Sequence, residues 1–167
     1  MELYLLRHGI AVELGTEGCN KDADRPLTAK GERKVAEVAR AMQAMEVSFD
    51  LILSSPYVRA RHTAEIVAER LGLRKVLELS DLLVPGGSFR EVIEFLKKRR
   101  RGIRTVLLVG HEPFMSGFIA FVLSGHPNAP ITMKKAGLCK LTFDALEYGR
   151  CARLEWLLTP AQMALMR

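Results

Sequence analysis

The feature that most constrains the fold is a short apolar run, residues 3–6, which ends abruptly in Arg7 and His8. An uninterrupted apolar run of this length is typical of a buried strand. A second such run, residues 106–109, ends shortly before His111. In open α/β sheets, ligands bind at the edge formed by the carboxyl ends of the strands. We therefore expect the two histidines to meet in one site at that edge.

Short apolar runs alternate with amphipathic helical segments, which is typical of an α/β domain with a mainly parallel sheet. We predict a three-layer α/β/α sandwich whose sheet is mainly parallel and has an antiparallel edge. The parallel strands are expected at residues 2–7, 51–54, 76–79 and 105–109. Two later runs, residues 137–143 and 151–158, predict a hairpin that closes one edge of the sheet.

Helices are expected between these strands. Thr28, Ser88 and Pro113 mark the starts of three of them, Thr28 as an N-cap and Ser88 as the first residue of a capping box. Another helix is expected over residues 57–71, where a glycine follows its last residue. Residues 160–167 predict a short terminal helix. The apolar positions of these segments recur at helical spacing, so we assign them to the core.

Composition places the chain among ordinary globular proteins. Its 167 residues predict a single domain over residues 1–167, with 49% hydrophobic and 26% charged residues. No apolar stretch approaches the roughly 20 residues of a membrane span, and no secretory leader is apparent. Cys19, Cys139 and Cys151 have no CxxC spacing, which argues against disulfides or a zinc site. We expect a cytoplasmic protein without membrane contact, with Cys139 and Cys151 inert in edge strands.

The net charge of +6 is partly concentrated in residues 97–101, a run of lysines and arginines. One interpretation is a patch that binds nucleic acid or an acidic partner. The other is the solvated C-terminal end of a helix, where cations complement the helix dipole. We favour the second because the run follows an amphipathic helix and contains no aromatic residue. Nucleic acid is therefore not an expected partner.

Three segments bring cations and imidazoles to the same edge of the predicted sheet. Arg7 and His8 end the first strand, and His111 follows a later one. Arg59 lies in the first turn of the second helix, where the amides and the helix dipole already favour an anion. Singly, each residue has an ordinary structural explanation. Together, two guanidinium groups and two imidazoles suit a phosphoryl group.

The motifs containing these residues resemble those of the histidine phosphatase superfamily, also called phosphoglycerate mutase-like. They are Leu6-Arg7-His8-Gly9, Ser54-Ser55-Pro56 with Arg59-Ala60 and Thr63-Ala64-Glu65, and Val109-Gly110-His111-Glu112-Pro113. Within that superfamily, Arg25-Pro26-Leu27-Thr28 with Gly31, together with the short chain, resembles the small SixA-type phosphohistidine phosphatases. The resemblance extends over nearly the whole chain and implies a phosphoglycerate mutase-like fold.

The resemblance also implies a mechanism. His8 is the nucleophile and becomes a transient phosphohistidine. Arg7, Arg59 and His111 bind the three equatorial oxygens, so no metal and no other cofactor is expected. Arg25 reaches the substrate from the loop at residues 11–26, which we expect to form a rim or lid. An equally weighted alternative is that Arg25 is a solvent-exposed residue preceding a helix.

A general acid is not evident, because the region where larger members of the superfamily carry one is short here. Asp81 and Glu112 are the two candidates. An alkoxide leaving group needs a proton, whereas imidazole leaves more readily, which favours phosphoramidate substrates. His62 is expected near the pocket without a catalytic role, and His126 in a loop.

The leading hypothesis is a metal-independent phosphatase that acts on a phosphohistidine-bearing protein, such as a phosphotransfer domain or a phosphocarrier. A broad small-molecule phosphomonoesterase with the same fold is the second hypothesis, and a phosphoglycerate mutase is less favoured because the chain is short. A phosphoprotein-binding module without turnover is the alternative from another class, and a nucleic-acid binder comes last. The oligomeric state is left open.

Overall fold

A six-stranded sheet in the order β3-β2-β4-β1-β5-β6 forms the centre of the computed structural model, which describes residues 1–16, 18–99 and 101–166. Strands β1 (Glu2–Arg7), β2 (Leu51–Ser54), β3 (Leu77–Leu79) and β4 (Thr105–Gly110) pair in parallel. Strand β5 (Leu138–Phe143) pairs antiparallel to β1, and β6 (Ala152–Leu158) pairs antiparallel to β5 at the edge. The predicted mainly parallel sheet with an antiparallel hairpin at one edge is confirmed.

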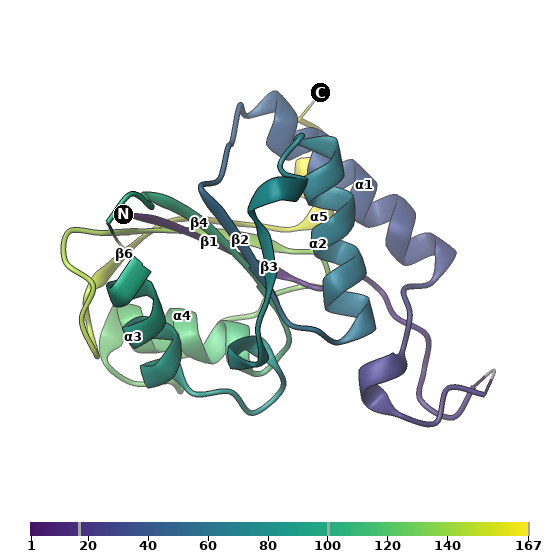
Figure 1. The fold of residues 1–167 in the computed structure, drawn as a ribbon, viewed down its shortest axis with the longest axis horizontal. Coiled ribbons are helices and arrows are strands. Elements are labelled where there is room, and N and C mark those ends of the chain that lie inside the picture. Colours follow the sequence, from purple (N-terminus) through teal and green to yellow (C-terminus); the bar gives the residue numbers. More distant parts are fainter. Residues whose placement is uncertain (17, 100, 167) are drawn as a thin grey trace.

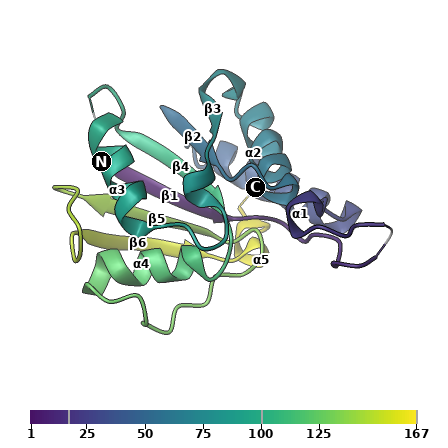
Figure 2. The same ribbon diagram turned by 60° about the horizontal axis from the view of Figure 1, so that its bottom comes forward.

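Helices cover both faces of this sheet (Figures 1 and 2). Helices α1 (Ala29–Ala44), α2 (Val58–Arg70) and α5 (Pro160–Met163) lie on one face. Helices α3 (Phe89–Arg99) and α4 (Phe114–Ser124) lie on the other. Each face has its own cluster of buried apolar side chains, so the three-layer sandwich is confirmed.

Strand β1 is apolar at successive positions because it has helices on both sides. Leu3 and Leu5 belong to the cluster under α3 and α4, whereas Leu6 belongs to the cluster under α1 and α2. In the parallel register with β4, Arg7 is opposite Gly110. This register places the residues that follow both strands at the same edge of the sheet, as the two apolar runs predicted.

Local signals in the sequence set most of the element boundaries. The Thr28 hydroxyl accepts a hydrogen bond from the backbone of Gly31 at the start of α1, as an N-cap does. Gly72, after α2, has a φ of 70°, which favours glycine. The prediction for β3 was one residue too long at its start, because Val76 closes a 3-10 turn before the strand begins.

Two further expectations need correction or qualification. Cys139 does not lie in an edge strand: β5 is flanked by β1 and β6, and the thiol is fully buried. The first three residues of the basic run, Lys97, Lys98 and Arg99, form the last turn of α3, whereas Arg100 lies outside the described residues. No helix in the described ranges is long and apolar enough to cross a membrane.

The loop between β1 and α1 is partly ordered by pairing with itself. Ala11 forms an isolated antiparallel bridge with Leu27, and residues Asp22–Asp24 form a 3-10 turn. This turn contacts the start of α2, as Figure 1 shows near the lower right of the molecule. The loop therefore forms a rim at the carboxyl edge of the sheet.

Candidate active site

Arg7, His8, Arg59 and His111 converge at the carboxyl edge of the sheet, as the sequence predicts. The imidazole rings of His8 and His111 have their centroids 5.1 Å apart. His8, Arg59 and His111 are 7%, 4% and 1% exposed, respectively. Burial of so many polar groups without carboxylates among them is costly unless a ligand or a neighbour compensates, which is typical of a functional site.

His8 is held in one tautomer by the backbone. Its Nδ1 lies 2.7 Å from the carbonyl oxygen of Gly9. A carbonyl oxygen can only accept, so Nδ1 carries the proton and Nε2 carries the free lone pair. Burial, together with the nearby charges of Arg59 and Arg7, lowers the pKa of His8 to about 3, although the bond to Gly9 acts in the opposite direction. His8 is therefore a neutral imidazole with a nucleophilic Nε2 at physiological pH.

The guanidinium group of Arg59 points directly at this lone pair. Its Nε donates to His8 Nε2 at 3.2 Å. Its two terminal nitrogens donate to Asp22, Nη1 to the backbone oxygen at 2.5 Å and Nη2 to Oδ2 at 2.9 Å. Asp22 thus holds the two terminal nitrogens of Arg59, while Nε of Arg59 faces His8 Nε2.

Asp22 is a site residue that sequence reasoning missed. It comes from the 3-10 turn of the long loop, and its carboxylate bridges Arg59 and Arg25. Burial would raise the pKa of Asp22, but hydrogen bonds from Arg25 and Arg59 outweigh this effect and hold it below its usual value. The available signal was the spacing of Asp22 three residues before Arg25, which fits one turn of 3-10 helix.

Arg25 does approach the site, but through Asp22. Its Nε donates to the carbonyl oxygen of Val12 at 2.6 Å, and its Nη1 donates to Asp22 Oδ1 at 2.8 Å. These contacts hold the rim loop together and keep Asp22 against Arg59. The expected direct role of Arg25 in binding substrate stays a prediction, while its contact with Asp22 is part of the structure.

His111 is also held in a defined orientation, in this case by Ser55. The His111 Nε2 lies 2.8 Å from Ser55 Oγ, which in turn accepts the backbone N–H of Tyr57 at 3.3 Å. If the Ser55 hydroxyl donates its proton to Nε2, the proton of the His111 ring is on Nδ1. Nδ1 is buried and has no partner within the described chain. Burial, followed by the charge of Arg59, lowers the pKa of His111 to about 4.

Arg7 completes the group from the opposite side. Its Nη1 donates to the carbonyl oxygen of Met133 at 2.7 Å, and its buried Nε has no partner among the described residues. The backbone N–H of Ala136 donates to the carbonyl oxygens of Arg7 and His8, so the turn before β5 fixes the end of β1. Burial lowers the pKa of Arg7, yet an arginine keeps its charge at physiological pH.

Close packing of the segment that follows His8 depends on glycine at position 31. A Cβ on Gly31 would collide with the backbone oxygen of Ile10, so only glycine lets the start of α1 approach the chain that leaves His8. The N–H of Gly9 donates to Thr63 Oγ1 at 3.1 Å, and Thr63 donates to the carbonyl oxygen of Arg59 at 2.7 Å. Helix α2 thereby anchors both the nucleophile segment and Arg59.

The two candidate acids occupy different environments. Asp81 is exposed, at the start of a 3-10 turn after β3. Glu112 follows His111, and its Oε2 accepts a hydrogen bond of 2.5 Å from Ser116 on α4. His62 faces Glu32 at 3.7 Å, at the outer side of α2, and His126 lies in a loop after α4.

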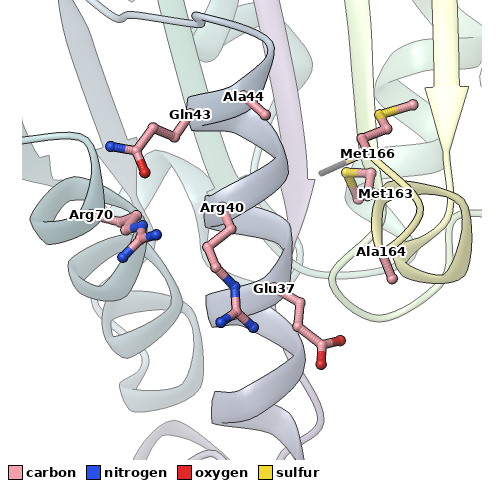
Figure 3. Close-up of a pocket in the computed structure, with 8 residues that line it drawn as sticks. All are labelled: Glu37, Arg40, Gln43, Ala44, Arg70, Met163, Ala164 and Met166. Carbon is pink, nitrogen blue, oxygen red and sulfur yellow. The ribbon is translucent and has the colours of Figure 1, made fainter.

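A separate pocket of about 460 Å³ lies between α1 and α5. Figure 3 shows Glu37, Arg40 and Gln43 of α1 between Arg70 of α2 and the methionines near α5. None of the four predicted catalytic residues lines it, and its lining contains neither a thiol nor an imidazole. The pocket is therefore separate from the candidate active site.

No group of three or more histidine, cysteine or carboxylate side chains in the described ranges is arranged to hold a metal ion. The charges that act on His8 itself are the guanidinium groups of Arg59 and Arg7, which can bind anions. His111 Nδ1 and Arg7 Nε are buried and have no hydrogen-bond partner among the described residues. Donors from several directions around one lone pair fit a tetrahedral oxyanion such as phosphate.

Comparisons with known proteins agree with this chemistry. The family model of the histidine phosphatase superfamily (branch 1) matches residues 3–83. An uncharacterised protein of Picosynechococcus is 37% identical over 147 residues, covering 87% of each chain. A phosphohistidine phosphatase SixA homologue of Haemophilus influenzae is 30% identical over 86% of this chain and 89% of its own.

The fold is shared as well. A solved structure of the protein histidine phosphatase SixA, complexed with tungstate, superposes with a TM-score of 0.84. It is 26% identical in sequence, and the match covers 96% of this chain and 98% of that one. The chain therefore belongs to the histidine phosphatase superfamily and is a SixA-like phosphatase.

Proposed function

We propose that the protein hydrolyses the P–N bond of phosphohistidine on a protein partner, through a covalent phosphohistidine formed on His8. The observation that carries this proposal is the state of His8: Nδ1 is bonded to Gly9, and the lone pair of Nε2 faces Arg59. A neutral imidazole with a fixed tautomer needs no further activation to attack phosphorus.

In the first step, the lone pair of His8 Nε2 forms a bond to phosphorus while the P–N bond of the substrate breaks. The electron pair of that bond stays on the departing nitrogen. In the second step, water attacks phosphorus, the P–Nε2 bond breaks and its electron pair returns to His8. The protons of the water end on phosphate and in solvent. Splitting the reaction in this way replaces one difficult displacement by two easier ones.

Arg7, Arg59 and His111 would bind the equatorial oxygens and offset the charge that develops on them. Arg59 Nε, now on His8 Nε2, would turn to a phosphoryl oxygen as phosphorus takes the lone pair. His111 would donate from Nδ1, its free ring nitrogen. These groups supply electrostatic stabilisation by side chains alone, and neither a metal nor another cofactor is required.

The substrate class is inferred from the relatives and from the short connection between β3 and α3. The relatives named above are a phosphohistidine phosphatase homologue and a protein histidine phosphatase. Only residues 80–88 connect β3 to α3, so this connection has no room for a long covering insertion. A phosphotransfer domain or phosphocarrier could therefore present its phosphohistidine directly. The free cysteines Cys19, Cys139 and Cys151 fit action in a reducing cytoplasm.

Trapping of the phosphoenzyme tests the proposal. The protein is mixed with a histidine-phosphorylated phosphocarrier, quenched in alkali and analysed for acid-labile phosphate on His8 by mass spectrometry. We expect label on His8 in the parent protein and none in His8→Asn. Turnover of p-nitrophenyl phosphate without turnover of the phosphoprotein would instead identify a small-molecule phosphomonoesterase. Phosphoprotein binding without any phosphoenzyme would identify a binding module.

A further inference from the structure

The carboxylate of Glu112 presents a buried acceptor that the chain itself leaves unused. Oε2 accepts the short bond from Ser116 Oγ, whereas Oε1 is inaccessible to solvent and accepts nothing from the described residues. A buried acceptor without a partner costs on the order of 1–3 kcal/mol. Such an atom in a native structure calls for an explanation, such as a catalytic role or a bound water or ion.

Glu112 is linked to the candidate site by its place in the sequence and by its charge. It is the neighbour of His111, and its negative charge acts on Arg7, where it opposes the lowering of the pKa by burial. Buried donors without a partner belong to the same two residues, Arg7 Nε and His111 Nδ1. Two unused ring or guanidinium nitrogens and one unused carboxylate oxygen thus belong to Arg7, His111 and the residue that follows His111.

A bound phosphoryl group would provide hydrogen-bond partners for only some of these three buried atoms. The oxygens of a dianionic phosphoryl group accept hydrogen bonds, so they satisfy Arg7 and His111. They cannot satisfy Glu112 Oε1, which needs a donor. The remaining part of a phosphohistidine substrate is an imidazole ring, whose second nitrogen carries a proton when the ring is cationic.

We infer that Glu112 determines specificity for phosphohistidine by accepting the ring N–H of the leaving imidazole, with Ser116 positioning the carboxylate. The inference rests on the proposed function and names the residue that recognises the leaving imidazole of the substrate. With that proton kept on the second nitrogen, the P–N electron pair passes to the first nitrogen and neutral histidine departs. Without it, the ring would have to depart as an imidazolate, a poor leaving group.

A hydrogen-bond acceptor also holds the ring proton of the nucleophile, His8. The carbonyl oxygen of Gly9 holds the proton on His8 Nδ1, so His8 can carry phosphorus on Nε2 as a cationic ring and release it to water as a neutral one. Glu112 would do for the substrate imidazole what Gly9 does for His8. An aryl ester has no such N–H, and the nitrophenolate ion leaves without a proton, so Glu112 would be idle on that substrate.

Glu112→Gln tests the inference with two substrates, a histidine-phosphorylated peptide and p-nitrophenyl phosphate. With Ser116 donating to the amide oxygen, the amide nitrogen would face the ring N–H, donor against donor. We expect kcat on the phosphopeptide to fall about 10- to 100-fold, the worth of a hydrogen bond to a charged group. Turnover of the ester should stay within about 3-fold of the parent value on the same scale. The alkaline limb of the kcat–pH profile should move to lower pH.

Ser116→Ala and Glu91→Gln complete the test. Ser116→Ala keeps the Glu112 carboxylate but removes the hydroxyl that positions it. We expect a smaller fall in kcat on the phosphopeptide and unchanged turnover of the ester. This variant tests the inference even if Glu112→Gln fails to fold. Glu91 is an exposed acid in the first turn of α3, so Glu91→Gln controls for the loss of a charge near a helix start. Equal losses on both substrates in Glu112→Gln, no loss on either, or the same pattern in Glu91→Gln would overturn the inference. Parent protein that cleaves only the ester would refute the proposed function itself.

Discussion

Asp22 grips Arg59 with both its backbone oxygen and its carboxylate, while Arg59 Nε points at His8 Nε2. The rim loop therefore orients the Arg59 guanidinium group toward the nucleophilic nitrogen. Arg25 secures the other carboxylate oxygen of Asp22, so the clamp is a chain of three charged residues. A preorganised donor of this kind stabilises a transition state because it needs no reorganisation when charge develops.

Asp22→Asn should lower kcat about 10-fold, because an amide cannot accept from Arg25 and Arg59 with both of its terminal atoms and a small misplacement of a donor is costly. KM should change less than kcat, since the effect is on alignment of Arg59. Steady-state kinetics on a histidine-phosphorylated protein gives both values. An unchanged kcat would show that Arg59 keeps its orientation without the clamp.

Arg59→Ala should lower kcat by about 100- to 1,000-fold, the usual cost of removing one preorganised donor from an oxyanion site. The same change frees Asp22 and the 3-10 turn that contacts α2. Limited proteolysis should then cut the loop at residues 11–26 faster than in the parent protein. Arg61→Ala, on the exposed side of the same helix, is the control and should alter neither measurement.

Ser55→Ala tests the tautomer assigned to His111. Loss of the hydroxyl leaves His111 Nε2 buried without a partner, at a cost of about 1–3 kcal/mol in unfolding free energy. It also lets the ring proton move to Nε2, so we expect kcat to fall while the phosphoenzyme still forms. Urea denaturation and rapid-quench labelling of His8 measure the two effects. Parent-like kcat would show that Ser55 does not control the ring.

The sequence predicts the sheet and the four converging residues because both depend on local patterns. Apolar runs on β1 and β4 are dictated by helices on both faces, and parallel pairing brings Arg7, His8 and His111 to one edge. Arg59 is predictable from its place in the first turn of α2. To predict that these four residues converge, it is enough to locate the ends of two strands and the start of one helix in the sequence.

Asp22 and the partners of Arg25 could not be predicted in the same way. Both depend on how a long loop folds back over α2, and such contacts are not encoded in any periodic pattern. The burial of Glu112 Oε1 likewise depends on the packing of α4 against the edge of the sheet. Side-chain hydrogen bonds between distant segments are tertiary information.

Gly31→Ala should destabilise the protein by about 1–3 kcal/mol, the usual cost of overpacking. The added methyl group would meet the backbone of Ile10, which cannot move without displacing the segment that follows His8. We therefore expect a lower urea midpoint together with reduced activity. Gly86→Ala offers a comparison: it has open space around its Cβ position but a φ of 87°, so any loss there reports backbone strain alone.

The buried histidines should make stability depend on pH. Well above pH 6.5 His8 is neutral in both the folded and the unfolded chain, so it contributes no pH dependence there. As the pH falls from 6.5 toward its folded pKa of about 3, the unfolded chain binds a proton that the folded chain does not, and the unfolding free energy decreases. At about pH 4.5 this loss is about 3 kcal/mol for His8.

His8→Asn should remove this part of the pH dependence. The difference in unfolding free energy between pH 7 and about pH 4.5, measured by urea denaturation, should be smaller in the variant by about 3 kcal/mol. His126→Asn, in an exposed loop, is the control for replacing a histidine by asparagine. Equal differences in the parent protein and in His8→Asn would mean that His8 titrates near its ordinary pKa, and the neutral nucleophile would then need another explanation.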